Sequence, residues 1–187
     1  MTEKPYKLKE RKPVCENRYY SIYFDSFERD GRLAIENYLV VTPKTLTANN
    51  VYGVGILPIM GNKVGLVQID RHPLEQTGWE VPGGFVEPGE SSSSAALREL
   101  NEEGGVTCEP ENLQDLLLVA PAPSIIGAKI QLFAAFNCYP SESGRTPELG
   151  HREFRWFTKK AIETMVQSGE IHESVTLLAY YRTRHMV

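Results

Sequence analysis

The sequence has few cysteines and no pattern among them. Cys15, Cys108 and Cys138 are its three cysteines in 187 residues, and no two of them have C-x-x-C spacing. An odd number of scattered cysteines indicates neither a disulfide framework nor a zinc site. We therefore expect a protein of the reducing cytoplasm.

The sequence also lacks a basic block and a long apolar run. No five consecutive residues are Lys or Arg, and the net charge of −4 argues against a nucleic-acid partner. Apolar runs such as Leu116–Ala120 are far shorter than the roughly 20 residues that a membrane helix needs. Residues 1–13 are charged and have no apolar core of a secretory signal. We expect no membrane association and no nucleic acid.

The length of the chain predicts one compact domain with a terminal extension. Residues 1–13 show little periodicity, and we expect a loose arm there. Two aromatic and β-rich runs within 17–41 flank the turn Glu28–Arg32, which predicts a hairpin. We therefore divide the chain into an N-terminal arm and β segment, 1–48, and a main domain, 49–187.

The main domain alternates extended runs with helical ones. A mixed sheet sandwiched by helices follows from this order, in an α/β or α+β arrangement. We expect strands at 51–60, 64–71, 79–82, 113–120, 130–139 and 154–158, a turn at 76–78, and helices at 92–104, 159–167 and 171–184.

The most informative stretch is residues 84–106. A turn-rich loop leads to Ser91, a plausible N-cap, and helix-forming residues continue to Gly104-Gly105, which suits a helix end. In that helix, three glutamates (Glu99, Glu102 and Glu103) lie on one side and repel one another. One interpretation is a solvated acidic face. The other is a site for a divalent cation such as Mg²⁺, which binds carboxylate oxygens and bridges them to phosphate.

The spacing within this stretch favours the cation site. It reads Gly84, five residues, Glu90, seven residues, then Arg98-Glu99-Leu100-x-Glu102-Glu103-x-Gly105-Val106. This pattern resembles the signature box of the Nudix hydrolases at every specified position. The resemblance implies an α/β/α sandwich with a mixed β-sheet. It also implies hydrolysis of a nucleoside diphosphate linked to another group, with Mg²⁺ or Mn²⁺ bound by the box.

The resemblance also implies a role for each residue of the box. Glu99 and Glu103 are the expected metal ligands, with Glu102 as a further ligand or a contact through water. The carbonyl of Gly83, just before the box, matches a main-chain metal ligand of the relatives. The residues expected to shape the motif are Gly84, Glu90, Arg98 and Gly105, with a salt bridge between Arg98 and Glu90.

Features outside the box resemble the ADP-ribose and nucleotide-sugar pyrophosphatases. The pattern Asn17…Asp25-x-Phe27…Gly31 is similar to the extra N-terminal β segment of that branch, which commonly builds a homodimer. Pro121 follows Val106 by fifteen residues, where those enzymes usually carry a proline. The substrate contacts implied are Arg71, Tyr20, Glu80 and Pro121. From the residues alone, the tyrosines of the hairpin suit packing as well as stacking on a base.

One departure leaves the substrate open. The relatives usually read Ser-Pro-Gly-Phe-Thr after the box, whereas this chain reads Ala120-Pro121-Ala122-Pro123-Ser124. ADP-ribose, GDP-mannose or a similar nucleotide sugar all remain candidates. Two alternatives remain as well: a non-catalytic module that senses a nucleotide, and a hydrolase of dinucleoside polyphosphates.

The catalytic base is expected in the loop and strand after residue 140. Its candidates are Glu142, Glu148, His151 and Glu153. Glu148 falls where the relatives carry a loop glutamate, and Glu153, three residues before Trp156, resembles a position used in other branches. Each of them could equally be a solvated loop residue. Together with Glu102 from the box, Glu148 and Glu153 form the predicted catalytic set.

Overall fold

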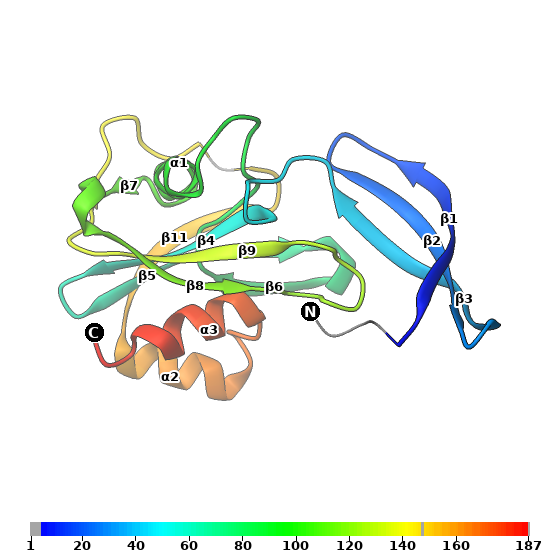
Figure 1. Ribbon diagram of the computed structural model, residues 1–187. Helices are drawn as coiled ribbons and strands as arrows, with labels where there is room; N and C mark the ends of the chain where they lie inside the picture. Colours follow the sequence, from blue (N-terminus) through cyan, green and yellow to red (C-terminus); the bar gives the residue numbers. More distant parts are fainter. Residues whose placement is uncertain (1–4, 147, 187) are drawn as a thin grey trace.

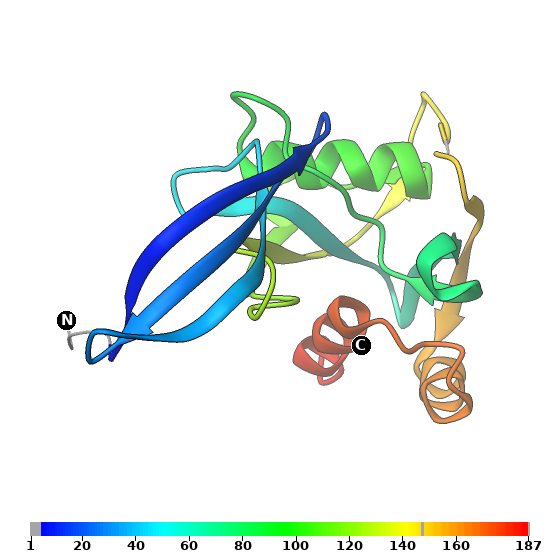
Figure 2. The same cartoon turned by 90° about the vertical axis from the view of Figure 1, so that its right-hand side faces the viewer.

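The computed structural model describes residues 5–146 and 148–186. It contains a three-stranded N-terminal sheet standing beside a larger part in which helices cover both faces of a second sheet (Figure 1). The layers of the larger part are helix, sheet and helix (Figure 2). The predicted α/β/α sandwich with a mixed sheet is confirmed.

The larger sheet is built around one buried strand. Its order is β11-β5-β4-β9-β8, with β6 paired to β5 beside this path. β4 and β9 run parallel and the other pairs are antiparallel. β4 is buried along its whole length except at Met60, as expected for a central strand covered on both faces. The strands are β4 (Val51–Met60), β5 (Lys63–Arg71), β6 (Gln76–Glu80), β8 (Leu113–Val119), β9 (Lys129–Ala135) and β11 (His151–Thr158).

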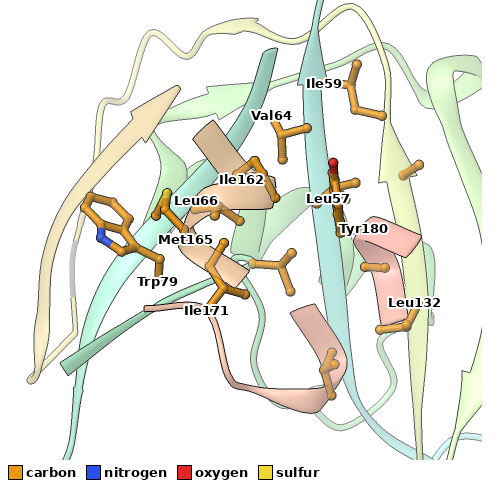
Figure 3. Close-up of a cluster of buried hydrophobic side chains, with 14 residues drawn as sticks. Leu57, Ile59, Val64, Leu66, Trp79, Leu132, Ile162, Met165, Ile171 and Tyr180 are labelled. Atoms are coloured by element: carbon orange, nitrogen blue, oxygen red, sulfur yellow. The ribbon is translucent and has the colours of Figure 1, made fainter. Parts of the chain in front are cut away.

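The helices divide the core into two halves. α1 (Ser92–Gly104) covers one face, and α2 (Lys159–Ser168) and α3 (Ser174–Thr183) cover the other. The half under α2 and α3 is the cluster drawn in Figure 3, which includes Leu57, Leu132 and Tyr180. The half under α1 contains Ile56, Leu100 and other apolar residues. Because Leu100 of α1 and Ile56 of β4 belong to the same apolar cluster, this packing fixes the position of α1 on β4.

The N-terminal sheet has the order β1-β2-β3, in strands β1 (Lys7–Glu16), β2 (Tyr20–Arg29) and β3 (Arg32–Pro43). The predicted hairpin is the β2–β3 pair, and it turns at Asp30-Gly31. Asp25 is buried within this sheet and accepts two hydrogen bonds from Arg11, at 2.8 and 2.7 Å. Removal of that partner would leave a buried charge unpaired, so this contact ties β1 to β2.

Two sequence predictions about strands are wrong. The expected loose arm at 1–13 is mostly β1, which pairs with β2. Its residues are exposed on both faces, so the sequence carries no apolar alternation to reveal a strand. The expected turn at 76–78 belongs to β6, where Gly78 faces the backbone of Glu170 and the ring of His172.

Two further boundaries differ at later elements. The run 130–139 is interrupted at Asn137, which has a φ of 53°, so β9 ends at Ala135. A separate short strand, β10 (Tyr139–Pro140), then pairs with β7 (Val106–Thr107) after α1. The last helix begins at Ser174 instead of residue 171, because the side chain of Glu173 caps it. No helix in the described residues is long and apolar enough to cross a membrane.

Truncation of the core at β9 should destabilise the whole larger part. Leu132 is fully buried, so we expect Leu132→Ala to lower the free energy of unfolding by about 2–5 kcal/mol. Leu118, on the neighbouring strand β8, is 41% exposed, so Leu118→Ala should cost no more than about 0.5 kcal/mol. Urea unfolding followed by circular dichroism measures both values. Equal losses in the two variants would contradict this assignment of the core.

Candidate metal and nucleotide site

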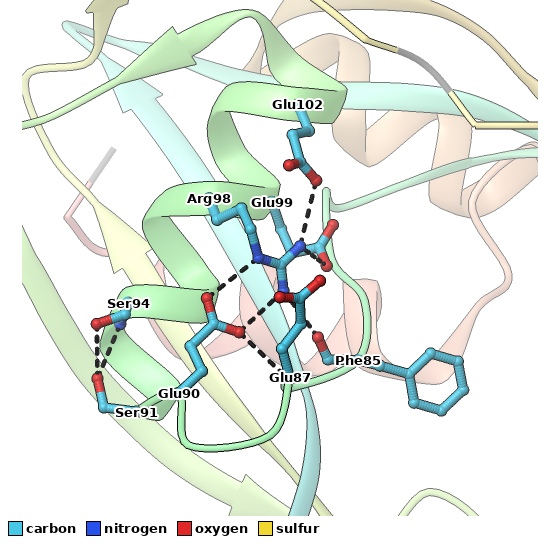
Figure 4. Close-up of polar contacts among 8 residues, drawn as sticks. All are labelled: Phe85, Glu87, Glu90, Ser91, Ser94, Arg98, Glu99 and Glu102. Atoms are coloured by element: carbon cyan, nitrogen blue, oxygen red, sulfur yellow. Dashed lines mark hydrogen bonds and ion pairs between the residues drawn. The ribbon is translucent and has the colours of Figure 1, made fainter. Parts of the chain in front are cut away.

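Both ends of α1 have the caps that the sequence predicts. The hydroxyl of Ser91 accepts a hydrogen bond from the backbone N–H of Ser94 at 3.1 Å (Figure 4). Gly105 has a φ of 64°, in the left-handed region, and its N–H donates to the carbonyl of Asn101. Because both ends of α1 are capped, the turn that carries Glu99, Glu102 and Glu103 does not fray.

α1 lies directly against the backbone that precedes the box. The N–H of Gly83 donates to Oε2 of Glu103 at 2.8 Å. A Cβ atom on Gly84 would lie only 2.3 Å from Oε1 of Glu99, and one on Gly83 would lie 2.3 Å from the carbonyl oxygen of Val54. Only glycine fits at position 83, since a side chain there would push the backbone of β4 away, and a side chain at position 84 would displace the carboxylate of Glu99.

The carbonyl of Gly83 faces the same helix. The carbonyls of Pro82 and Gly84 accept hydrogen bonds from Ile56 and Val54 of β4, both at 2.9 Å. Carbonyls alternate in direction along an extended segment, so the carbonyl between these two is directed away from β4. The Gly83 N–H, which reaches Glu103, is directed to that same side. The structure therefore places the Gly83 carbonyl on the side of the box glutamates.

Two of the box carboxylates are buried. Glu103 is 2% exposed and Glu99 is 5% exposed. Burial raises the pKa of Glu103 to about 8, and the negative charges of Glu99 and Glu148 act in the same direction. Burial also raises the pKa of Glu99, although Arg98 opposes the shift. Two neighbouring buried carboxylates with raised pKa values are suited to a cation, which would favour their charged forms.

Arg98 holds the box together. Its guanidinium donates to both oxygens of Glu90, at 3.1 and 3.0 Å, and to the carbonyl of Phe85 at 2.9 Å (Figure 4). The expected ion pair between Arg98 and Glu90 is thus present. The same guanidinium also donates to Glu99 at 2.7 Å and to Glu102 at 3.2 Å. It therefore orients the loop and the helix together.

The donor set fits a hard divalent cation by its chemistry. Glu99, Glu102, Glu103 and the Gly83 carbonyl offer only oxygen atoms, which Mg²⁺ and Mn²⁺ prefer. Within residues 5–146 and 148–186, no group of three or more His, Cys, Asp or Glu side chains already converges to hold a metal ion. The position of Arg98 gives a reason, because its guanidinium draws Glu99 and Glu102 toward itself.

The structure brings Arg71 and Glu80 close to the box. Glu80 is buried at the end of β6 and accepts two hydrogen bonds from Arg71, at 3.0 and 2.6 Å. This bidentate contact fixes the plane of the guanidinium. Burial raises the pKa of Glu103, and the positive charge of Arg71 opposes this rise, so Arg71 lies within electrostatic reach of the box carboxylates.

Tyr20 belongs to an aromatic cluster next to the box. Its ring meets that of Phe85 edge-on, with 5.7 Å between centroids, and Tyr19 stacks on Phe85 at 4.9 Å. Tyr52 on β4 completes the cluster. Phe85 is 37% exposed, and the sequence interpretation missed it because it occupies an unspecified position of the box. Its signal was present, since an aromatic residue directly after Gly84 must lie beside the glutamates of the box.

The loop before β11 is attached to the C-terminal end of α1. Arg145 donates from Nε to the carbonyl of Glu103 at 2.6 Å, and the N–H of Thr146 donates to the carbonyl of Glu102 at 2.8 Å. These bonds satisfy carbonyls that a helix end leaves free. The positive charge of the Arg145 guanidinium also interacts favourably with the negative end of the helix dipole. Arg145 was missed, because nothing in the sequence connects a loop arginine with that helix end.

The predicted catalytic candidates separate into two groups. Glu148 is exposed, and its charge acts on both Glu99 and Glu103. The Nδ1 atom of His151 lies 3.3 Å from Oε1 of Glu103, and burial lowers the pKa of this histidine. Glu153 instead pairs with Arg155 at 2.7 Å, and the structure does not bring it to the box.

The contacts of Arg155 explain the position of Glu153. Phe154 and Trp156 pack in the half of the core under α1, whereas Phe157 packs in the other half, against Trp79. Glu153 bonds to Arg155, whose guanidinium lies over the ring of Trp79, so Glu153 is held on the side of Phe157, away from α1. A bulge between His151 and Phe154 lets His151 reach α1 instead. Pro121 lies in the loop between β8 and β9, which is hydrogen-bonded to β3 through Val41 and Ile125.

Comparison with known proteins agrees with this geometry. A family model described as the NUDIX domain matches residues 49–176, which is more than half of the chain. A CMP-5'-(N-acetyl-N-hydroxy-3-aminopropyl)phosphonate hydrolase of Streptomyces rubellomurinus is 24% identical to the chain, over 88% of it and 75% of the relative. An ADP-ribose pyrophosphatase of Bacillus subtilis is 27% identical, over 91% of the chain and 90% of the relative.

A solved structure shares the fold along the whole chain. The crystal structure of an ADP compounds hydrolase has a TM-score of 0.79 and 19% sequence identity, and the match covers all of this chain and 96% of the other. Proteins with this domain are in general hydrolases of nucleotide substrates that depend on a divalent metal. The domain match, the intact box and the arrangement of its glutamates agree, and the chain belongs to the Nudix hydrolase family.

Proposed function

We propose that the protein hydrolyses the diphosphate linkage of a nucleoside diphosphate sugar, such as ADP-ribose or GDP-mannose, in a reaction that depends on Mg²⁺. The products are a nucleoside monophosphate and a sugar phosphate. The observation that carries this proposal is the burial of Glu99 and Glu103 directly against the backbone of Gly83 and Gly84.

The cation would be held by Glu99, Glu102, Glu103 and the Gly83 carbonyl. When bound, Mg²⁺ (or Mn²⁺) neutralises diphosphate charge and polarises the bond to phosphorus. The protein contributes the rest. Burial keeps Glu99 and Glu103 away from competing water, and Arg98 fixes the loop that carries Phe85.

Substrate contacts surround this centre. Arg71, held flat by Glu80, offers a guanidinium to the diphosphate or the distal phosphate. The rings of Tyr20 and Phe85 offer an aromatic surface for the base. Pro121 and the loop Ala120–Ser124 lie toward the N-terminal sheet, where they would contact the distal sugar. The exposed carboxylate of Glu148 is our assignment for the general base that takes a proton from water, with Glu102 as the alternative on α1.

The relatives support the reaction and leave the substrate open. The Bacillus subtilis relative is an ADP-ribose pyrophosphatase and matches nearly its full length. The Streptomyces relative acts on a cytidine nucleotide joined to a phosphonate. Both names describe a nucleotide joined through phosphorus to a second group, so the linkage is shared while the base and the second group differ.

We also propose that the N-terminal segment, 1–48, forms a homodimer. Exposed apolar side chains gather on or beside its outer strands, and large exposed apolar patches usually mark an interface. They are Tyr6, Leu8, Val14, Leu33, Ile35, Tyr38 and Leu39.

We also propose that the protein works in the cytoplasm, because a reducing compartment keeps cysteines such as Cys15, Cys108 and Cys138 free of disulfides.

A panel of nucleotide sugars with Mg²⁺ and Mn²⁺, read by identification of the products, tests the reaction. We expect a nucleoside monophosphate and a sugar phosphate from at least one of them. Glu103→Gln removes the most buried carboxylate of the box, so we expect kcat to fall by about 10²–10³-fold, as for other charge-stabilising groups.

The control for this variant is Glu111→Gln, in the short 3₁₀ helix Pro110–Asn112 and outside the site, which should leave kcat unchanged. Unchanged turnover in a folded Glu103→Gln protein would refute the metal assignment. Tight binding of a nucleotide sugar without any product would instead favour a sensing module.

Substitution of Glu148, in the loop before β11, should affect kcat far more than substitution of Glu153, in β11 itself. Glu148→Gln should lower kcat by about 10²-fold, as expected for the loss of a general base. Glu153→Gln should leave it unchanged, because Glu153 pairs with Arg155 on the other face of β11. Steady-state kinetics as a function of pH measures both. A larger loss from Glu153→Gln would overturn this assignment of the base.

The dimer has its own test. Ile35 is 47% exposed on β3, and we expect Ile35→Lys to convert a dimer into a folded monomer in size-exclusion chromatography with light scattering. Leu118→Lys, at a similarly exposed position of β8, should leave the dimer intact. A wild-type protein that is monomeric at micromolar concentration would contradict the dimer.

A further inference from the structure

We propose that Thr176, on α3, is a positioning residue for the Gly83 carbonyl on the opposite face of the sheet. This inference rests on the proposed metal site and adds to it a residue from an element that carries none of the box. Thr176 acts through the backbone of residues 81–83 and does not touch the cation.

The link begins with a buried hydrogen bond between distant parts of the chain. The backbone N–H of Val81 donates to Oγ1 of Thr176 at 3.0 Å. Thr176 is 1% exposed and Val81 is 6% exposed, so water cannot replace this bond. Val81 is two residues before Gly83, in the short run that connects β6 to the box.

The hydroxyl of Thr176 is itself fixed in direction. It donates to Oε2 of Glu173 at 2.9 Å, and the same oxygen accepts the backbone N–H of Thr176 at 2.7 Å. A hydroxyl that donates to Glu173 must offer a lone pair in the remaining direction, toward Val81. Glu173 therefore sets the orientation of the acceptor, in addition to capping α3.

Close packing connects the position of α3 to the position of the Gly83 backbone. A Cβ atom on Gly55 would lie 2.8 Å from Cγ1 of Val175, the residue before Thr176. On Gly83, a Cβ atom would lie 3.0 Å from Cα of Gly55. The side chain of Val175 on α3 thus packs on the backbone of β4, and the backbone of Gly83 packs on the same residue of β4, so a shift of α3 is passed on through Gly55.

Thr176 holds the amide of Val81 between two anchored parts of the chain, since Glu80 before it pairs with Val67 of β5. Pro82 and Gly84 are held by β4, and the N–H of Gly83 is held by Glu103. Without the Val81 bond, the amide of Val81 would no longer be fixed between β6 and the part of the run held by β4, and a shift there would tilt the Gly83 carbonyl relative to the glutamates. A group that orients a metal ligand commonly changes metal affinity by about 10–100-fold.

The test uses the full chain and Mn²⁺ alone as the probe. In metal-free protein titrated with MnCl₂ by calorimetry, Thr176→Val should weaken Mn²⁺ binding about tenfold, and Thr176→Ser should restore it. The amide of Val81 should exchange with deuterium faster in Thr176→Val than in the wild type, because its acceptor is gone. This second readout needs neither metal nor substrate.

Thr183 provides a matched control on the same helix. It is fully buried, and its hydroxyl bonds only to carbonyls of α3, those of Ala179 and Tyr180. Thr183→Val should lower the melting temperature as Thr176→Val does, yet keep the wild-type Mn²⁺ affinity. If Thr176→Val does not fold, Thr176→Ala and Thr183→Ala remove the same hydroxyls without putting a methyl group in their place.

The outcomes separate this inference from the proposed function. Wild-type affinity for Mn²⁺ in Thr176→Val, or an equal loss in both threonine variants, would refute the role of Thr176 and leave the proposed function standing. A wild-type protein that binds no Mn²⁺ would refute the proposed function and this inference with it. Weakened binding confined to Thr176→Val, with faster Val81 exchange, supports the inference.

Discussion

The contact between α1 and the backbone of Gly83 and Gly84 is the constraint on which the site depends. A helix can approach a backbone this closely only where the facing residues have no side chain, and here a Cβ on Gly84 would collide with Glu99. The approach removes Glu99 and Glu103 from water and brings the N–H of Gly83 onto Glu103. The position of the helix is in turn set by apolar packing under it and by caps at both ends. The packing of the core is therefore what makes the carboxylates buried, and their burial is what raises the pKa of Glu103 to about 8.

The charges of the box are balanced locally by one arginine. Arg98 contacts Glu90, Glu99 and Glu102 at once, which offsets part of the repulsion that three neighbouring glutamates impose on a helix. Glu103 does not share this arginine; its contacts are the Gly83 N–H and the ring of His151. The carboxylate with the most perturbed pKa is thus the one least served by a fixed cation. In a family that depends on divalent metals, this is the position at which an added cation would stabilise the protein most.

The sequence predicted much of the fold because its strongest signals are local. The N-cap at Ser91, the glycines that end α1 and the apolar run of β4 each depend on a few adjacent residues, and the structure places all of them as expected. The predictions fail where structure depends on distant partners. β1 is exposed on both faces and is a strand only because β2 lies beside it. Arg145 was missed for the same reason: its partner, the carbonyl of Glu103, is far away in the sequence, and no local pattern reports the contact.

In the proposed function, the glutamates of the box and the rest of the chain contribute different parts of the specificity. The glutamates would serve only the metal and the charged linkage. The aromatic cluster beside it combines Phe85 from the box, Tyr52 from β4, and Tyr19 and Tyr20 from the start of the N-terminal hairpin. The loop after β8 is joined to that hairpin through Val41 and Ile125, and through a hydrogen bond from the hydroxyl of Tyr38 to the carbonyl of Ser124. The N-terminal sheet therefore contacts both the aromatic cluster and the loop, and it contacts none of the box carboxylates among the described side-chain bonds. In the proposed function, this separation would let the nucleotide and its second group vary while the chemistry at the linkage is retained, which agrees with relatives that act on different nucleotides.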